Sequence, residues 1–383
     1  MTKLRKLMVA GALCLLLPAH AQLSRQEAEQ AAQQIRQAWM ARTKAKYEQV
    51  YKYKVIYHGD RKMDLFWTVY GNKPADGRSL YISLHGGGGV PYEDNMFQWR
   101  NQWNLYTPKE GVYVAPHCPV SAWNMWCQAD ADAYYADIIK MAVTWLDVNP
   151  DKVYLLGYSA GGDGVWRMAP RMADAWAAAS MMAGHPGDVR LENLRNLPFM
   201  IWCGANDSAY NRNRLCAERI AQMDSLQRQD GGGYRHEGHI MAGKGHWMDR
   251  ADTAAIDWMA QFRRTAWPHR VVWHQAAEAR PYFYWLGAPR QELARGKEVR
   301  AEIKGQTVEI ERCDYSRLCI YLNDEMLNLD KPVTVRYRGR QLFKGRLYRT
   351  ATLLRETLRR RGDLRYSFPA VAEVTIPVSG AEK

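Results

Sequence analysis

The sequence predicts an α/β protein in which a mostly parallel β-sheet is flanked by helices and followed by a small β-rich C-terminal domain. Between residues 53 and 265, short apolar runs alternate with helical stretches, an order typical of parallel sheets covered on both faces. After Pro268 this alternation ends, and strand-like runs follow one another closely. A chain of 383 residues is also long enough for two domains.

Residues 1–21 have the pattern of a secretory signal peptide. Basic residues precede an apolar run over residues 7–17, and Ala19 and Ala21 supply the small side chains that signal peptidase reads. The alternative is an uncleaved membrane anchor, but the run is well short of the ~20 residues that span a bilayer. We therefore expect cleavage before Gln22 and a secreted or periplasmic protein.

Residues 22–50 are predicted to form an N-terminal helical segment. Ser24 and Glu27 have the spacing of a capping box, in which each side chain bonds the backbone N–H of the other residue. Apolar residues then recur at helical spacing, which predicts a helix over residues 24–47.

The predicted α/β domain covers residues 51–268. It opens with a β-hairpin, because strand-like runs flank the turn sequence His58-Gly59-Asp60. Strands that alternate with helices form one parallel sheet, to which the hairpin adds an antiparallel edge. Buried strands are predicted over residues 80–84, 112–115, 153–156, 178–182 and 199–202, and helices over residues 130–148, 162–173, 212–227 and 253–264.

The predicted β-rich domain covers residues 269–383. Turn signals such as Asn323-Asp324 separate its apolar runs. One late helix is predicted over residues 353–361, and strands over residues 271–274, 282–285, 299–303, 307–311, 319–322, 333–337 and 341–343.

Six cysteines remain after removal of the signal segment, and an even number agrees with export to an oxidising compartment. Short intervening loops favour three local disulfides, with six buried thiols as the alternative. No Cys-x-x-Cys pair is present, so we expect no zinc site. The predicted pairs are Cys118 with Cys127, Cys203 with Cys216, and Cys313 with Cys319.

The chain carries a formal net charge of +13, with an excess of basic residues after Arg270. A basic surface can attract nucleic acid, anionic lipid or acidic polysaccharide. The charges alternate with apolar residues instead of forming a run, which favours a solvated face. We expect no nucleic-acid partner and no membrane contact after signal removal. Polysaccharide contact through the C-terminal domain is the alternative.

The sequence Gly157-Tyr158-Ser159-Ala160-Gly161 lies between a predicted strand and a predicted helix. Glycines at its ends allow a tight strand-to-helix turn, which lifts the Ser159 hydroxyl above the sheet edge. The start of the helix also presents a positive dipole end to developing negative charge. This context predicts Ser159 as a nucleophile.

A glycine-rich loop, residues 85–89, follows the strand predicted over residues 80–84. Glycines let backbone N–H groups approach an oxyanion without obstruction by side chains. We expect the oxyanion donors to be Gly86, Gly87, Gly88 and Ala160. The alternative, a flexible loop or phosphate cradle, lacks the Lys-Ser/Thr of a P-loop.

A serine nucleophile needs a base, and the base needs a carboxylate that fixes its tautomer. Asp207 follows a buried strand, and His246 lies in a glycine-rich loop further on. Together with Ser159 they have the chain order serine, acid, histidine. Other candidates lie within strands, lie beside helices or break this order: His117, His185, His236, His239, Asp130, Asp132 and Asp163.

The succession His-Gly-Gly-Gly, Gly-x-Ser-x-Gly, Gly-x-x-Asp and Gly-x-His-Trp resembles secreted α/β-hydrolase esterases over about residues 53–265. It is similar to the branch of polyhydroxyalkanoate depolymerases, feruloyl esterases and dienelactone hydrolases. The resemblance implies an acyl-enzyme mechanism without cofactor or metal, carried by Ser159, Asp207 and His246. The β-rich tail is not part of the common esterase core.

We therefore expect hydrolysis of a small-molecule or polymer-borne carboxylic ester. One alternative is a serine peptidase of the prolyl-oligopeptidase type, although the chain is too short to hold the propeller of those enzymes. Another is a hydrolase-fold protein whose β-domain binds polysaccharide. The residues expected in the substrate cleft are His85, Tyr158, Trp123, Trp126 and Trp247.

Overall fold

The computed structural model describes residues 22–377 of the chain. The predicted signal peptide lies outside the described residues. Within them, no helix is long and apolar enough to cross a membrane.

An eight-stranded sheet has the order β1-β2-β4-β3-β5-β6-β7-β8. Pairing is antiparallel from β1 to β2 and from β2 to β4, and parallel in the rest of the sheet. The strands are β1 (Val55–His58), β2 (Arg61–Tyr70), β3 (Arg78–Leu84), β4 (Gly111–Pro116), β5 (Val148–Tyr158), β6 (Ala178–Met182), β7 (Phe199–Gly204) and β8 (His236–Met241). This sheet, with a serine at the turn after β5, has the α/β-hydrolase fold, as predicted.

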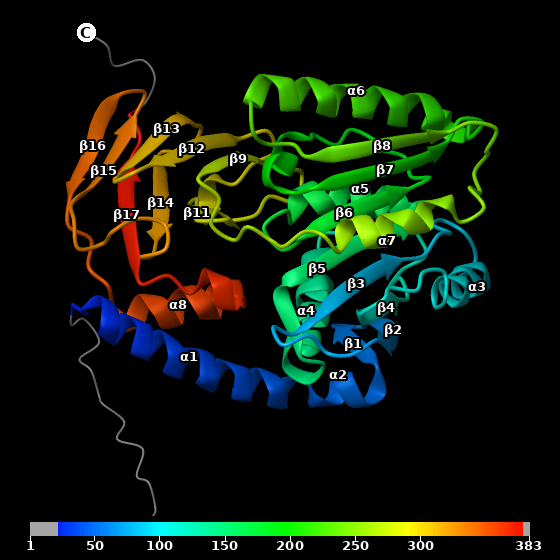
Figure 1. Cartoon of the computed structure of the whole chain (residues 1–383), viewed down its shortest axis with the longest axis horizontal. Helices are drawn as coiled ribbons and strands as arrows, with labels where there is room; N and C mark the ends of the chain where they lie inside the picture. The colour runs from blue at the N-terminus through cyan, green and yellow to red at the C-terminus, as the bar shows by residue number, and fades with distance from the viewer. Residues whose placement is uncertain (1–21, 378–383) are drawn as a thin grey trace, which may run out of the picture.

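Helices cover both faces of this sheet (Figure 1). Alternate residues of each central strand enter two different apolar clusters, as expected for a sheet buried on both sides. One cluster includes side chains of α4 (Ala131–Trp145), α5 (Ala160–Arg171) and α6 (Arg212–Asp230). The other includes α3 (Tyr92–Gln102) and α7 (Ala254–Met259). Helix α3 was not predicted from the sequence.

Helix α1 (Arg25–Lys46) runs beneath both parts of the molecule, from α8 (Ala351–Arg361) to the short α2 (Glu48–Tyr53) (Figure 1). The predicted capping box is confirmed: Glu27 N–H donates to Ser24 Oγ at 3.3 Å, and Ser24 N–H donates to Glu27 Oε2 at 2.8 Å. The apolar face of α1 packs on α8.

The C-terminal part holds two further sheets. A five-stranded sheet has the order β16-β15-β13-β12-β9, and a four-stranded sheet has the order β10-β11-β14-β17. The predicted strand over residues 282–285 is interrupted at Tyr284, whose φ of 50° breaks the extended backbone. The strands are β9 (Arg270–His274), β10 (Tyr282–Phe283), β11 (Leu286–Gly287), β12 (Glu298–Lys304), β13 (Thr307–Cys313), β14 (Arg317–Leu322), β15 (Val333–Tyr337), β16 (Arg340–Gly345) and β17 (Ala370–Thr375).

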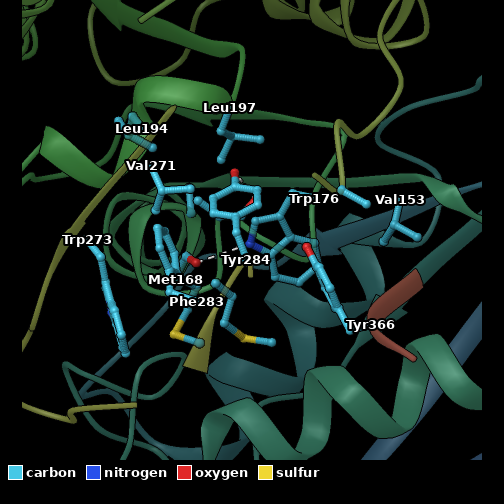
Figure 2. Packing of buried hydrophobic residues seen from close by; sticks show 14 of the residues in the cluster. Val153, Met168, Trp176, Leu194, Leu197, Val271, Trp273, Phe283, Tyr284 and Tyr366 are labelled. Carbon is cyan, nitrogen blue, oxygen red and sulfur yellow. Dashed lines mark hydrogen bonds between the residues drawn. The ribbon is translucent and has the colours of Figure 1, made fainter. Parts of the chain in front are cut away.

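The two parts share one apolar core. Figure 2 shows side chains from before and after Pro268 packed together in it. From the α/β part come Val153, Met168, Trp176, Leu194 and Leu197, and from the C-terminal part Val271, Trp273, Phe283, Tyr284 and Tyr366. All ten are buried, so each part covers surface that the other would expose.

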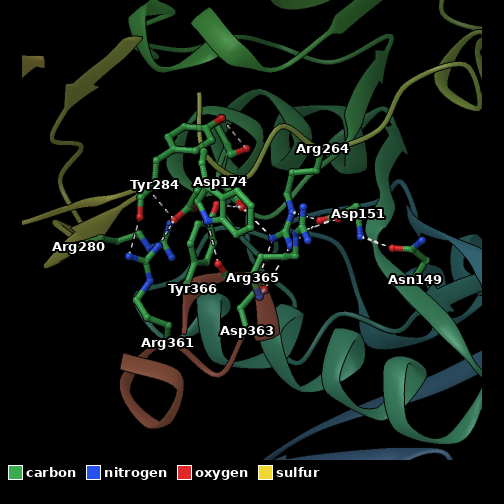
Figure 3. A network of polar contacts seen from close by, with 12 residues as sticks. Asn149, Asp151, Asp174, Arg264, Arg280, Tyr284, Arg361, Asp363, Arg365 and Tyr366 are labelled. Atoms are coloured by element: carbon green, nitrogen blue, oxygen red, sulfur yellow. Dashed lines mark hydrogen bonds and ion pairs between the residues drawn. The ribbon is translucent and has the colours of Figure 1, made fainter. Parts of the chain in front are cut away.

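A buried network of charges crosses the same junction (Figure 3). Asp174, at 2% exposure, accepts hydrogen bonds from Arg280 at 2.8 Å and Arg361 at 3.1 Å. Burial acts to raise the pKa of Asp174, but the guanidinium groups outweigh it and hold that pKa below its ordinary value. Arg264 pairs with Asp363 at 2.5 Å. The C-terminal part is therefore joined to the α/β part by ion pairs between side chains as well as by apolar packing.

The structure contradicts the prediction of three disulfides, because all six described cysteines are free thiols. Cys313 and Cys319 lie in strands of two different sheets, so their short loop does not bring the sulfurs together. The thiol of Cys203 in β7 donates to the Gly204 carbonyl at 3.7 Å, and that of Cys216 in α6 donates to the Gly184 carbonyl at 3.5 Å. In the third predicted pair, Cys118 is buried in the core, and Cys127 lies on a pocket wall.

Candidate active site

The turn between β5 and α5 holds Ser159 in a strained conformation, with φ 58° and ψ −122°. Such angles are uncommon for a residue with a side chain and occur at functional sites. Neighbouring backbone approaches the turn so closely that only glycine fits. A Cβ on Gly161 would lie 2.0 Å from the carbonyl oxygen of Leu84, and one on Gly157 would lie 2.4 Å from that of Gly161.

The structure brings Ser159, His246 and Asp207 together. His246 Nε2 lies 2.9 Å from Ser159 Oγ, and His246 Nδ1 lies 2.8 Å from Asp207 Oδ2. They follow β5, β8 and β7, three parallel strands whose carboxyl ends share one sheet edge. The Asp207 side chain is 1% exposed, and Arg212 lies 3.6 Å from its second oxygen. The arrangement suits proton transfer from a hydroxyl to an oriented imidazole.

Tyr158 holds the loop that carries His246. Its hydroxyl donates to the carbonyl of His246 at 2.7 Å and accepts from the N–H of Met248 at 3.2 Å. The Tyr158 ring is buried beneath this loop, in contrast to the expectation that it lines a substrate cleft.

The glycine-rich loop is fixed by Asn95 of α3, a buried residue that was not predicted from the sequence. Gly88 N–H donates to Asn95 Oδ1 at 3.1 Å, and Asn95 Nδ2 donates to the Gly88 carbonyl at 3.0 Å. Gly88 N–H is therefore already bonded, which contradicts its expected role as an oxyanion donor. Within the described chain, the N–H groups of Gly86, Gly87 and Ala160 have no partner in the hydrogen-bond network.

Gly87 itself has a φ of +110°, and a Cβ there would lie 2.1 Å from Asn95 Oδ1. Any other residue at this position would displace the amide that fixes the loop. Gly86 lies directly beside the nucleophile turn, since its Cβ position is 3.2 Å from Ser159 Cβ.

His85 is fully buried beneath this loop and does not reach a cleft, in contrast to the expectation. Its Nε2 accepts from the N–H of Cys118 at 3.1 Å, so Nδ1 carries the hydrogen and donates to the Gly86 carbonyl at 2.6 Å. Burial lowers the pKa of His85 to about 3. His85 thus supports the backbone of the loop as a neutral imidazole.

One group of described residues could hold a metal ion by proximity alone: His85, His117 and Cys118 have ligand atoms within 4.8 Å of one another. Both ring nitrogens of His85 are already in hydrogen bonds with backbone groups. A metal could bind there only at the expense of the contacts that shape the glycine-rich loop.

Several aromatic side chains belong to the loops next to the nucleophile turn, and they differ in exposure. Trp123 is 63% exposed and Trp247 49% exposed. Trp126 is buried and donates to the His85 carbonyl at 3.0 Å, and it lines a pocket beside Ala160 together with Trp123. Tyr210, which was not predicted, lies with its ring centroid 6.1 Å from that of Trp123. Its position beside Trp123 depends on two successive left-handed residues, Tyr210 and Asn211, which no local sequence pattern indicated.

Comparison with known proteins finds no matching family model and no matching curated protein. Solved structures with similarity include a thermostable esterase, with 16% identity and a TM-score of 0.43, over 55% of this chain and 62% of that one. Est1E from Butyrivibrio proteoclasticus has 15% identity and a TM-score of 0.37, over 54% of this chain and 97% of that one. An acetyl xylan esterase from Aspergillus awamori has 14% identity and a TM-score of 0.35, over 51% of this chain and 93% of that one.

Proposed function

We propose that this protein is a serine hydrolase that cleaves carboxylic esters through an acyl-enzyme intermediate. The observation that carries the proposal is the continuous pair of hydrogen bonds from Asp207 through His246 to Ser159, on a strained turn at the sheet edge. Export of the protein is part of the proposal and rests on the amino-terminal sequence pattern alone.

In the acylation step, His246 Nε2 takes the proton of Ser159 Oγ as that oxygen attacks the ester carbonyl carbon. Asp207 accepts the Nδ1 hydrogen and stabilises the imidazolium that forms. The carbonyl oxygen becomes negative and is held by the N–H of Ala160 and by an N–H of Gly86 or Gly87. The tetrahedral intermediate then collapses, and the departing alkoxide takes the proton from His246.

In the deacylation step, a water molecule replaces the alcohol. His246 takes one water proton while the oxygen attacks the acyl carbon, and Ser159 leaves with the proton returned by the imidazole. The products are an alcohol and a carboxylic acid.

The test compares Ser159→Ala with the parent protein on p-nitrophenyl acetate. We expect a loss of about 10³-fold or more in kcat/KM. Ser225→Ala, a substitution on helix α6, is the matched control and should leave the rate unchanged. Retention of the parental rate by Ser159→Ala would reject the proposal. Efficient cleavage of the matched p-nitroanilide would show amide hydrolysis instead of ester hydrolysis.

A further inference from the structure

We propose that a pocket between helix α5 and the C-terminal part binds a carboxylate carried by the ester substrate, with Arg167 and Arg295 as its ligands. The inference rests on the proposed function, because it assigns part of the substrate of Ser159. It also gives the C-terminal part a role in substrate choice.

The pocket has a volume of about 440 Å³ and begins beside the nucleophile. Its first wall is one face of α5, because its lining residues recur at helical spacing: Ala160, Asp163, Gly164, Arg167, Pro170 and Arg171. Ala160 directly follows Ser159, so this wall leads away from the reacting atoms along the helix. Trp123 lines the same end of the pocket.

The C-terminal part forms the facing wall. Residues 273–278, together with Arg280 and Arg295, line the pocket opposite α5. These residues lie at the end of β9, follow it or precede β12, and the common esterase resemblance of the sequence ends before them. The pocket therefore exists only because the C-terminal part packs on the α/β part.

Two of the arginines in the pocket have a structural role. Arg171 is paired with Asp132 at 2.8 Å, and Arg280 is paired with Asp132 at 3.2 Å and with Asp174 at 2.8 Å. Their side chains are mostly buried, and their charges are matched by carboxylates. They are not available to a ligand.

Arg167 and Arg295 differ from these two buried arginines, because they share a single carboxylate. Asp188 Oδ1 lies 2.8 Å from Arg167, and Asp188 Oδ2 lies 2.6 Å from Arg295. Two guanidinium groups and one carboxylate leave one positive charge. The side chains are 42% and 64% exposed, so unused N–H donors of both can reach a ligand. A planar guanidinium suits bidentate binding of a carboxylate.

The other carboxylates on the pocket wall have partners of their own. Asp163 is half-buried and accepts the backbone N–H of His185 at 2.5 Å. Glu278 faces Arg171 at 3.5 Å. His185 Nδ1 accepts from the N–H of Gly187 at 3.0 Å, so its Nε2 is a further donor on the pocket wall.

Helical geometry sets the length of the expected substrate. Arg167 follows Ala160 by seven residues, a rise of about 10 Å along α5. Its side chain leans back toward the start of the helix and so toward Ser159. The carboxylate should therefore be separated from the scissile carbonyl by a chain of several bonds.

The test uses p-nitrophenyl monoesters of succinic, adipic and suberic acid, each paired with a neutral p-nitrophenyl ester of similar length. The parent protein should favour the anionic ester at one of the longer lengths, and added salt should weaken the preference. Arg167→Gln and Arg295→Gln should each lower kcat/KM for that ester about tenfold or more, because a charged hydrogen bond is lost. For the neutral ester of the same length, kcat/KM should change less than about twofold.

Arg263→Gln is the matched control, since this exposed arginine pairs with Asp76 and does not line the pocket. This variant should have the parental kcat/KM for both the anionic and the neutral esters. Equal losses on anionic and neutral esters in the two pocket variants would overturn the carboxylate site. So would a preference for the neutral ester at every length.

Binding to the Ser159→Ala protein separates this inference from the proposed function. Titration calorimetry with adipate should detect binding that Arg295→Gln weakens about tenfold. Absence of adipate binding at millimolar concentration would overturn the carboxylate site while leaving ester hydrolysis standing. Adipate binding by a protein that hydrolyses no ester would reject the function of Ser159 and keep the site.

Discussion

At the residue scale, the proposed chemistry depends on the two hydrogen bonds of the His246 imidazole. Their geometry requires Nδ1 to carry the hydrogen toward Asp207, which leaves the Nε2 lone pair for Ser159. The carboxylate of Asp207 enforces this tautomer because it can only accept a hydrogen bond.

Asp207→Asn tests this dependence. An amide can donate to Nδ1 and so favour the wrong tautomer, which should lower kcat about 10⁴-fold without unfolding the protein. Asp224→Asn, at a half-exposed position on α6, is the control and should retain parental activity. Rates on p-nitrophenyl acetate and circular dichroism spectra provide the measurements, and a fully active Asp207→Asn would contradict the proposed role.

His85 predicts a specific pH dependence of stability. Its folded-state pKa is depressed to about 3 by burial, whereas an unfolded histidine titrates near ~6.5. Between these two pKa values, His85 is therefore protonated in the unfolded chain and neutral in the folded chain. The free energy of unfolding should fall by up to about 1.4 kcal/mol per pH unit as pH decreases from about 6.5 toward 3.

Urea unfolding of the parent protein and His85→Asn at pH 7, 5.5 and 4.5 measures this contribution. The variant should be less stable at pH 7, since it loses a buried hydrogen bond, but its stability should fall less steeply with acid. Identical slopes for the two proteins would show that His85 is not held neutral by the fold.

At the scale of elements, helix α3 determines the shape of the glycine-rich loop through Asn95. Asn95 Nδ2 also donates to Ser121 Oγ at 2.9 Å and so joins three segments. Asn95 touches no reacting atom in this arrangement and is a positioning residue. Its effect on catalysis should pass through the N–H groups of the loop.

Asn95→Ala should therefore lower kcat about tenfold or more while changing KM little, because oxyanion stabilisation is expressed in the transition state. Asn95→Asp keeps the acceptor for Gly88 N–H and should recover part of the loss. Steady-state kinetics with p-nitrophenyl acetate measures kcat and KM for both variants. If kcat of Asn95→Ala falls only by the same factor as the yield of soluble protein, Asn95 has a purely structural role.

Local sequence patterns predicted the elements that carry strong periodicity. The capping box of α1, the β1–β2 hairpin and the turn at Ser159 each contain their signals within a few residues. Their physical causes are local, which is why the sequence sufficed. The chain order of Ser159, Asp207 and His246 added the connection between distant loops.

Features set by long-range contacts were missed or mistaken. The thiols of Cys313 and Cys319 are close in sequence but belong to different sheets. Asn95 lies on a helix that was not predicted, so its burial could not be inferred. His85 and Tyr158 have residue types common in clefts, and only tertiary packing shows that they bond the backbone of neighbouring loops.

At the scale of the whole molecule, the C-terminal part is joined to the α/β part through a common core and a buried ion network (Figures 2 and 3). Helix α1 packs against α8, and its Lys44 carbonyl accepts a hydrogen bond from Trp145 Nε1 of α4 at 2.8 Å. Chain segments from both ends thus stabilise the body that positions Ser159.

Asp174→Asn tests this coupling. Loss of the carboxylate leaves the buried Arg361 without its counter-charge and Arg280 with Asp132 alone, which should destabilise the protein by about 3–5 kcal/mol. Asp257→Asn removes an exposed pair with Lys109 and should change stability little. Urea unfolding gives the free energy of unfolding of the parent protein and of each variant. An Asp174→Asn protein as stable as the parent would show that the network does not join the two parts.

Covalent labelling with a fluorophosphonate tests the role of Ser159 as nucleophile most directly. The proposed function predicts one phosphonyl adduct per chain, mapped by mass spectrometry to Ser159 and absent from Ser159→Ala. Labelling should also be greatly slowed in His246→Ala, because the base is missing. An adduct on another serine, or undiminished labelling of Ser159→Ala, would contradict the claim.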